Sequence, residues 1–168
     1  MSVQAIAGVS PRTESRVMTV FPSISSTALG ATLGWLYGCL PLRVFGPKLS
    51  TLLFALPTAP LGALMFLWTK VKGDRYVLTN QSLQIWNALG TKRLKTVPLA
   101  EIQSISTHQS PGQEFFRAAD IRLQGANGQT LAVLKGVAEY APFLNAIEVT
   151  LQSHRLVKSS LATIAARK

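Results

Sequence analysis

Residues 20–42 read VFPSISSTALGATLGWLYGCLPL, residues 49–69 read LSTLLFALPTAPLGALMFLWT, and neither stretch contains a charged residue. Between the two stretches the only charges are Arg43 and Lys48. Because a helix rises about 1.5 Å per residue, each stretch is long enough to cross a hydrocarbon core roughly 30 Å thick. The pattern therefore predicts a transmembrane hairpin over residues 17–70, with spans at about 20–42 and 49–69 and a tight turn between them.

Basic residues are unevenly placed around these stretches and predict their orientation. Arg12 and Arg16 precede the first stretch, while Lys70, Lys72 and Arg75 follow the second, and only two cations lie in the turn. The positive-inside rule places the more basic flanks in the cytoplasm. We therefore expect a multi-pass protein of the cytoplasmic (inner) membrane with both termini cytoplasmic, including an N-terminal arm of residues 1–16.

Small residues recur at every fourth position in both stretches and predict close helix packing. Residues four apart lie on one helix face, and small side chains there let two backbones approach. The other stretch is the simplest partner, a second copy of the chain could also fit, and ordinary glycine usage in membrane helices would also explain the row. The candidate packing residues are Ser26, Gly30, Gly34, Gly38, Ala55, Ala59 and Ala63.

The composition argues against several classes of function. The formal net charge is +10, and thirteen basic and six acidic residues lie after residue 69. A basic excess beside a bilayer favours anionic lipid headgroups, and no helix-turn-helix, zinc or RNA-binding motif points to nucleic acid as a partner. Cys39 is the only cysteine, so an intramolecular disulfide is excluded. Neither uncharged stretch has an ionisable residue at its middle, which argues against transport.

After residue 70 the pattern changes to short alternating segments separated by turns, which is typical of β-strands. Asn80-Gln81 and Asn127-Gly128 are the clearest turns, and Gly136 is expected to end the β region. The expected strands cover residues 75–79, 82–89, 93–99, 101–108, 119–124 and 130–134.

Helical spacing follows the strands. Phe143, Leu144, Ile147 and Leu151 recur at intervals of three and four within residues 138–151, so they form one apolar stripe. We expect an α+β chain in which the hairpin is followed, over residues 71–154, by a small β-barrel or sandwich of six or seven strands capped by a C-terminal helix. A basic tail, residues 155–168, could extend that helix, lie on a membrane or fray.

Four short segments carry a family resemblance. RYVLTN at residues 75–80, VPLAEI at 97–102, DIRL at 120–123 and LKGV at 134–137 resemble the bacterial pleckstrin-homology-like (PH-like) domains that follow two membrane spans. The Pro22-Ser23 pair also resembles the start of the first span in that family. One departure is Arg117-Ala118-Ala119, where members often have a glycine-rich turn. The resemblance implies this architecture and, since most members have no assigned chemistry, little about activity.

The sequence contains no recognisable catalytic or metal-binding motif. His108 and His154 are far apart and belong to no ligand-like spacing, and Gly-x-Ser-x-Gly and phosphate-loop motifs are absent. We therefore expect no enzyme activity, no catalytic or metal-ligating residue and no cofactor.

A basic hairpin is the first candidate binding surface. Trp86 alternates with Leu83 and Ile85, so its indole is expected to point away from the core. Beside it lie three cations, and this combination suits a lipid-headgroup interface. The candidate residues are Trp86, Lys92, Arg93 and Lys95. A basic edge strand that blocks aggregation would give the same pattern. Phosphoinositide binding is not expected, because the Asn80-Gln81-Ser82 turn lacks a cation.

The loop over residues 111–119 is the second candidate surface. It contains Phe115, Phe116 and Arg117, and adjacent aromatic residues in such a loop either plug one end of the barrel or contact a partner. The resulting hypothesis is a non-enzymatic membrane protein that binds or positions a membrane-associated protein as an accessory or assembly subunit. The alternative is an anionic-lipid-sensing module. Expected partners are membrane lipids and a protein in a membrane complex or homo-oligomer, but not nucleic acid.

Overall fold

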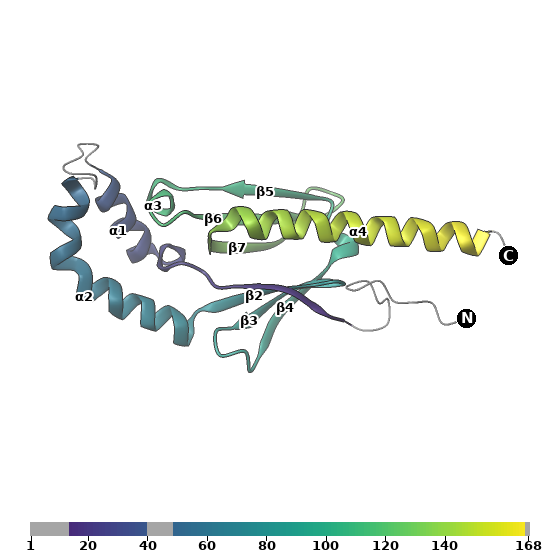
Figure 1. The fold of residues 1–168 in the computed structure, drawn as a ribbon, viewed down its shortest axis with the longest axis horizontal. Coiled ribbons are helices and arrows are strands. Elements are labelled where there is room, and N and C mark those ends of the chain that lie inside the picture. Colours follow the sequence, from purple (N-terminus) through teal and green to yellow (C-terminus); the bar gives the residue numbers. More distant parts are fainter. Residues whose placement is uncertain (1–13, 40–48, 167–168) are drawn as a thin grey trace.

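Short strands joined by tight turns form two antiparallel sheets in the computed structural model, which describes residues 14–39 and 49–166 (Figure 1). The first sheet has the order β1-β2-β3-β4, and the second has the order β5-β6-β7. The strands are β1 (Arg16–Val20), β2 (Asp74–Thr79), β3 (Ser82–Asn87), β4 (Arg93–Pro98), β5 (Ser104–His108), β6 (Ala118–Gln124) and β7 (Thr130–Ala138). The helices are α1 (Ala28–Gly38), α2 (Leu49–Lys72), α3 (Pro111–Glu114) and α4 (Tyr140–Ala166), with 3-10 turns at Ile24–Ser26 and Leu99–Glu101.

The turn residues set the register of the hairpins. Asn80-Gln81 joins β2 to β3, so that Leu78 pairs with Leu83 and Tyr76 pairs with Ile85. Gly128 has a φ of +70°, a left-handed conformation that glycine adopts without strain. The predicted end of the β region at Gly136 is wrong, because β7 continues through it to Ala138. Gly136 has a φ of +57° and faces the Ser26 backbone so closely that a side chain would not fit.

Both sheets and α4 share one hydrophobic core. Phe143 and Ile147 of α4 are completely buried among Leu83 and Leu78 of the first sheet and Ile121 of the second. The arrangement is a PH-like α+β fold with two sheets and a C-terminal helix, and the predicted fold class is wrong in its transmembrane hairpin. α4 does not stop near residue 151 but continues as a helix through the basic tail to Ala166. Arg155 Nη2 donates to the carbonyl oxygens of Ile102 and Gln103, both at 3.3 Å.

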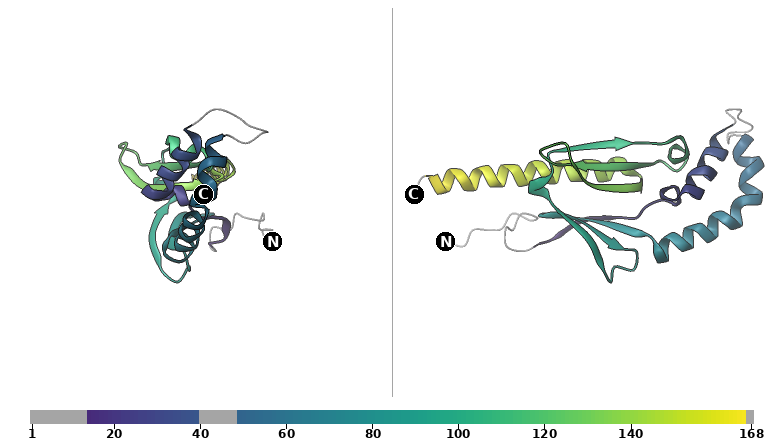
Figure 2. Two further views of the ribbon diagram at one scale, coloured as in Figure 1. Left: turned by 90° about the vertical axis from the view of Figure 1, so that its left-hand side faces the viewer. Right: turned by 180° about the vertical axis from the view of Figure 1, so that it is seen from behind.

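The first sheet begins with a strand that the sequence pattern did not predict. β1 pairs with β2, although residues 21–73 separate the two strands in the sequence. Helices α1 and α2 are therefore the connection between two neighbouring antiparallel strands. Figure 2 shows both helices at one end of the molecule, while α4 extends beyond the sheets at the other end.

The predicted transmembrane hairpin and the predicted inner-membrane, multi-pass location are wrong. In residues 14–39 and 49–166, no helix combines the length and the apolar character that a membrane span requires. The first predicted span is divided between the end of β1, a 3-10 turn and α1, which has only 11 residues and is about 16 Å long. α2 contains Pro57 and Pro60 and carries Lys70 and Lys72 in its last turn. The predicted turn at residues 43–48 and most of the predicted N-terminal arm lie outside the described residues.

Candidate binding surfaces

Trp86 lies between two arginines on the outer face of the first sheet. The β2–β3 register places Arg75 opposite Trp86, and the β3–β4 register places Arg93 opposite it on the other side. The Cζ atoms of Arg75 and Arg93 lie 5.8 Å and 5.9 Å from the centroid of the indole ring, which is within cation–π range. Arg75 Nε is buried without a hydrogen-bond partner, and the guanidinium packs on Gly90, whose φ is +73°. Trp86 and the arginines form a cationic–aromatic cluster.

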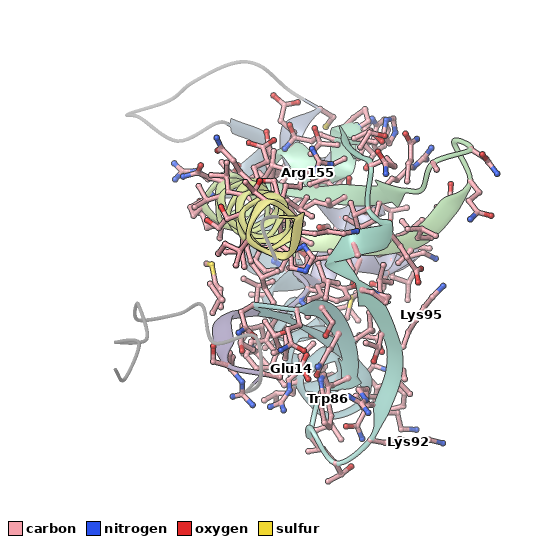
Figure 3. All side chains as sticks on the ribbon, turned by 90° about the vertical axis from the view of Figure 1, so that its right-hand side faces the viewer. Glu14, Trp86, Lys92, Lys95 and Arg155 are labelled. Carbon is pink, nitrogen blue, oxygen red and sulfur yellow. The ribbon has the colours of Figure 1, made fainter. Side chains whose placement is uncertain are left out.

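Two of the predicted headgroup residues lie apart from this cluster. Lys92 is at the end of the β3–β4 hairpin, and Lys95 is to one side of it (Figure 3). Lys95 pairs with the core residue Ile85, so it belongs to the opposite face of the strand from Trp86. Of the three predicted cations, the structure brings only Arg93 onto the Trp86 ring.

A row of buried polar side chains continues from Trp86 along the outer face. Trp86 Nε1 donates to Gln84 Oε1 at 2.8 Å, which directs the Gln84 amide nitrogen toward Glu14. Gln84 Nε2 and the Ser82 hydroxyl donate to Glu14 Oε1 at 2.7 and 2.6 Å. The Thr79 hydroxyl lies within donating distance of both Glu14 Oε1, at 2.8 Å, and the Ser82 carbonyl oxygen, at 2.7 Å. We call Thr79, Ser82 and Gln84 the polar cradle. All three are buried, although Glu14 itself is exposed and belongs to the segment before β1.

The polar cradle predicts a pH effect on stability. Hydrogen bonds from Ser82 and Thr79, with smaller contributions from Gln84 and the charge of Arg93, lower the pKa of Glu14 below its ordinary value. A lowered pKa in the folded state stabilises the fold above the ordinary carboxyl value of about 4.3, and this stabilisation is lost as the pH falls through the folded pKa. We expect the melting temperature to fall less between pH 6 and pH 3 in Glu14→Gln than in the parent chain. Parallel melting curves that fall equally would contradict this expectation.

Phe115 and Phe116 lie against α1. Phe115 makes edge-to-face contacts with Tyr37 and Phe116, with ring centroids 5.0 and 5.1 Å apart, and it remains 38% exposed. Arg117 has a left-handed φ of +49°, and its only salt bridge in the described part of the chain is a 3.9 Å contact with Glu139 between exposed side chains. The two phenylalanines therefore pack the loop between β5 and β6 against α1.

The row of small residues in α1 faces several neighbours. A Cβ built at Gly34 would overlap the carbonyl oxygen of Gly112 in α3, and one at Gly30 would overlap the carbonyl oxygen of Ile24. A Cβ at Gly38 would meet nothing within 4 Å. Ser26 lies against Gly136 of β7.

On α2, Ala55 is half-buried, whereas Ala59 and Ala63 are exposed. The helices contact each other through a hydrogen bond between the Tyr37 and Thr58 hydroxyls.

The helix pair also exposes many large apolar side chains. Two lysines mark one end of this surface. Lys70 Nζ lies 4.2 Å from the Phe21 ring centroid and 5.3 Å from that of Phe66, and Lys72 Nζ lies 4.4 Å from that of Trp68. We call the exposed apolar side chains the helix-pair surface: Leu29 and Trp35 of α1, and Leu53, Leu61, Leu64, Phe66, Leu67, Trp68 and Val71 of α2.

No cluster of metal-binding side chains occurs in the part of the chain that the structure describes. No three His, Cys, Asp or Glu side chains there are placed to hold a metal ion. Burial raises the pKa of Tyr76, whose hydroxyl donates to the Lys135 carbonyl oxygen and accepts from the Lys135 amide. A tyrosine held protonated in this way has a structural role.

Arg75 and Glu14 are the residues that sequence reasoning missed. The Asn80-Gln81 turn was predicted, and counting back from it pairs Arg75 with Trp86. Glu14 gave no such signal, because it precedes a strand whose partner is more than fifty residues away.

Comparison with known proteins gives one match. A family model described as "Bacterial PH domain" matches residues 23–152, which include α1, α2, the strands β2–β7 and the first part of α4. No curated protein and no solved structure matches the chain.

Proposed function

Because the chain belongs to the bacterial PH domain family, we propose that it is a non-enzymatic binding module that holds its PH-like domain at an anionic membrane surface. PH domains bind lipids or proteins and are generally not catalytic. The observation that carries the proposal is the helix-pair surface, with its two lysines stacked on aromatic rings at one end.

Exposed apolar surface of this kind indicates an interaction site. Leu64 is 66% exposed and Trp68 is 60% exposed. In contact with hydrocarbon, these apolar side chains would be more stable than they are in contact with water. Tryptophan and lysine are favoured at the headgroup level, where the indole has an apolar body and a polar edge and the ammonium meets phosphate. The helix-pair surface thus has the chemistry of a segment that lies on a bilayer with its apolar side inserted.

The two lysines provide a direct test. We expect Lys70→Gln with Lys72→Gln to weaken binding of the full chain to vesicles containing anionic lipid. Each cation near such a surface contributes about 1 kcal/mol, so the affinity should fall roughly thirty-fold. Flotation with phosphatidylglycerol-containing vesicles at 0.05 and 0.5 M salt would measure the affinity of the parent chain and of the variant.

Lys158→Gln on the exposed part of α4 removes one positive charge, so it is the control for each of the single variants Lys70→Gln and Lys72→Gln, and it should change the affinity little. Equal losses in the control and in either single variant would show that binding depends on net charge alone. Full retention of binding by the Lys70/Lys72 variant would contradict the proposed surface.

A protein partner is the second candidate, and the shape of the helix pair favours it. A groove of about 500 Å³ runs between α1 and α2 and is lined by Thr27, Ala28, Leu29, Leu64, Met65, Trp68 and Thr69. An apolar groove that includes a flexible methionine suits an amphipathic helix of a membrane-associated protein, for which this chain would be an accessory or assembly subunit. Absence of vesicle binding, together with recovery of a protein that is lost in Met65→Asp, would favour this reading.

A further inference from the structure

α4 carries apolar side chains on the side that faces away from the two sheets. Ile147 and Leu151 are buried in the shared core, and Val149 lies two positions from each of them, which places it on the opposite side of a helix with about 3.6 residues per turn. Val149 is 55% exposed, and Leu156 and Ile164 are each 60% exposed. Positions three or four apart lie on one side of a helix. We call the resulting set the outer α4 face: Asn145, Val149, Ser153, Leu156, Ser160 and Ile164.

The C-terminal part of α4 extends beyond both sheets (Figure 1 and Figure 2). Arg155 still contacts the body of the fold through its hydrogen bonds to the carbonyl oxygens of Ile102 and Gln103. After Arg155 the helix continues for about three turns. Isolated helices shorter than about 12–15 residues are marginal in water, so such an extension needs packing to be stable. Because Leu156 and Ile164 remain exposed in the described part of the chain, we expect another molecule to cover them.

The distribution of charge favours a second copy of this chain as that molecule. The net charge is +10, so two copies repel each other over most of their surfaces. No residue of the outer α4 face is ionisable, and the nearby Glu148, Arg155 and Lys158 lie outside it. Two copies can therefore meet along this face without placing one cation against another. An acidic protein would find no cation on the face to pair with.

The outer α4 face also complements itself when two copies run antiparallel. If Ser153 lies opposite Ser153 of the second copy, Val149 lies opposite Leu156 and Asn145 lies opposite Ser160, and each of these pairs occurs twice. Apolar side chains then meet apolar ones, and the Asn145 amide meets a hydroxyl with which it can form a hydrogen bond. Since the face is opposite the side of α4 that packs on the sheets, the two folded domains lie on opposite sides of the helix pair without overlapping.

We propose that the chain forms a two-fold symmetric dimer through the outer α4 face, with the two α4 helices antiparallel. Residues 145–164 correspond to a contact about 28 Å long on each helix. The contact covers the part of α4 that extends past the sheets, which explains why apolar side chains continue there. This inference does not depend on the function proposed for the helix-pair surface, because that surface belongs to α1 and α2.

Leu156→Glu in the full chain tests the dimer. The parent chain should sediment as a dimer that dissociates on dilution. The variant should raise the dissociation constant at least roughly hundred-fold, because the symmetric contact then contains two carboxylates opposite apolar side chains. Lys158→Gln changes the net charge by the same one unit from outside the face, so it is the matched control and should leave the dissociation constant unchanged. Circular dichroism should show that both variants fold, since both positions are exposed and lie outside the core.

Cysteine cross-linking tests the antiparallel register. In a Cys39→Ser background, Ser153→Cys should form a disulfide-linked dimer on oxidation, because the two-fold axis brings this position opposite itself and a disulfide needs two close Cα atoms. Ser160→Cys should form at least roughly ten-fold less cross-linked dimer, because Asn145 lies opposite it. Equal cross-linking at both positions would indicate parallel helices and would overturn the proposed arrangement.

Two results of sedimentation would overturn the dimer itself. One is a parent chain that stays monomeric at every concentration, even if the outer α4 face then binds a different protein or a vesicle. The other is an equal dissociation constant for the parent chain and Leu156→Glu, since association would then use another surface, such as the helix-pair surface.

Discussion

Replacing Phe143 with alanine is expected to lower the free energy of unfolding by about 3–5 kcal/mol, the usual range for a buried aromatic side chain. Phe143 is completely buried and belongs to the core cluster that includes Leu83 of the first sheet and Ile121 of the second. Its removal leaves a cavity where three structural elements meet. Because typical domains are stable by only 5–15 kcal/mol, the variant should unfold at markedly lower urea concentration.

Val149→Ala in the same helix is the matched control. Val149 is 55% exposed, and its truncation should change the free energy of unfolding by no more than about 0.5 kcal/mol. Urea titrations followed by circular dichroism would measure both variants. If both variants unfolded at similar urea concentrations, burial of Phe143 in the shared core would not be what stabilises the contact between α4 and the two sheets.

The PH-like part of the fold could be predicted because its signals are local. Alternation and turn residues act over fewer than ten positions, and β2, β3 and β6 lie close to where the sequence places them. The apolar stripe of α4 is equally local. Its members Phe143, Ile147 and Leu151 are buried, and Leu144 is half-buried at the edge of the stripe.

The hydrophobic block misled the sequence analysis because apolar character alone does not specify what covers it. Residues 16–20 become a strand only because β2, far along the chain, supplies their hydrogen-bond partners. Ser23 is then fixed to β7, since its amide donates to the Gly136 carbonyl at 2.7 Å. These long-range contacts shorten the helix that the first stretch can form to α1. Propensity over a window of twenty residues contains no information about them.

The candidate surfaces were partly visible in the sequence. Strand parity correctly sets Trp86 apart from the core residues Leu83 and Ile85, and the hairpin register adds Arg75 to it. Lys92 and Lys95 are close to Arg93 in sequence but lie at a hairpin end and on the opposite strand face. Arg93 and Lys95 are two positions apart, so a regular strand would place them on one face, but the register shift between Ile85 and Trp86 pairs Arg93 with Trp86 and Lys95 with Ile85.

Gly34→Leu is expected to destabilise the contact between α1 and α3 by about 3 kcal/mol. A Cβ at this position would overlap the Gly112 carbonyl oxygen and approach the Phe116 ring to 2.7 Å, and backbone on both sides prevents an easy adjustment. The reciprocal position shows the same constraint, because a Cβ at Gly112 would overlap the Ala31 carbonyl oxygen. Hydrogen exchange of residues 28–38 and 111–116 should become faster in this variant.

Gly38→Leu in the same helix separates this contact from a general effect of removing glycine. A Cβ at Gly38 meets nothing within 4 Å, and leucine is a better helix former than glycine. The Gly38 variant should therefore change the free energy of unfolding by no more than about 0.5 kcal/mol and leave exchange in α3 unchanged. If both variants behave alike, the row of glycines reflects composition. If only Gly34→Leu loosens α3, the glycine row is the contact that fixes the helix-pair surface to the PH-like domain. When the Gly34→Leu variant binds to vesicles, its PH-like domain should then have a less defined orientation relative to the membrane.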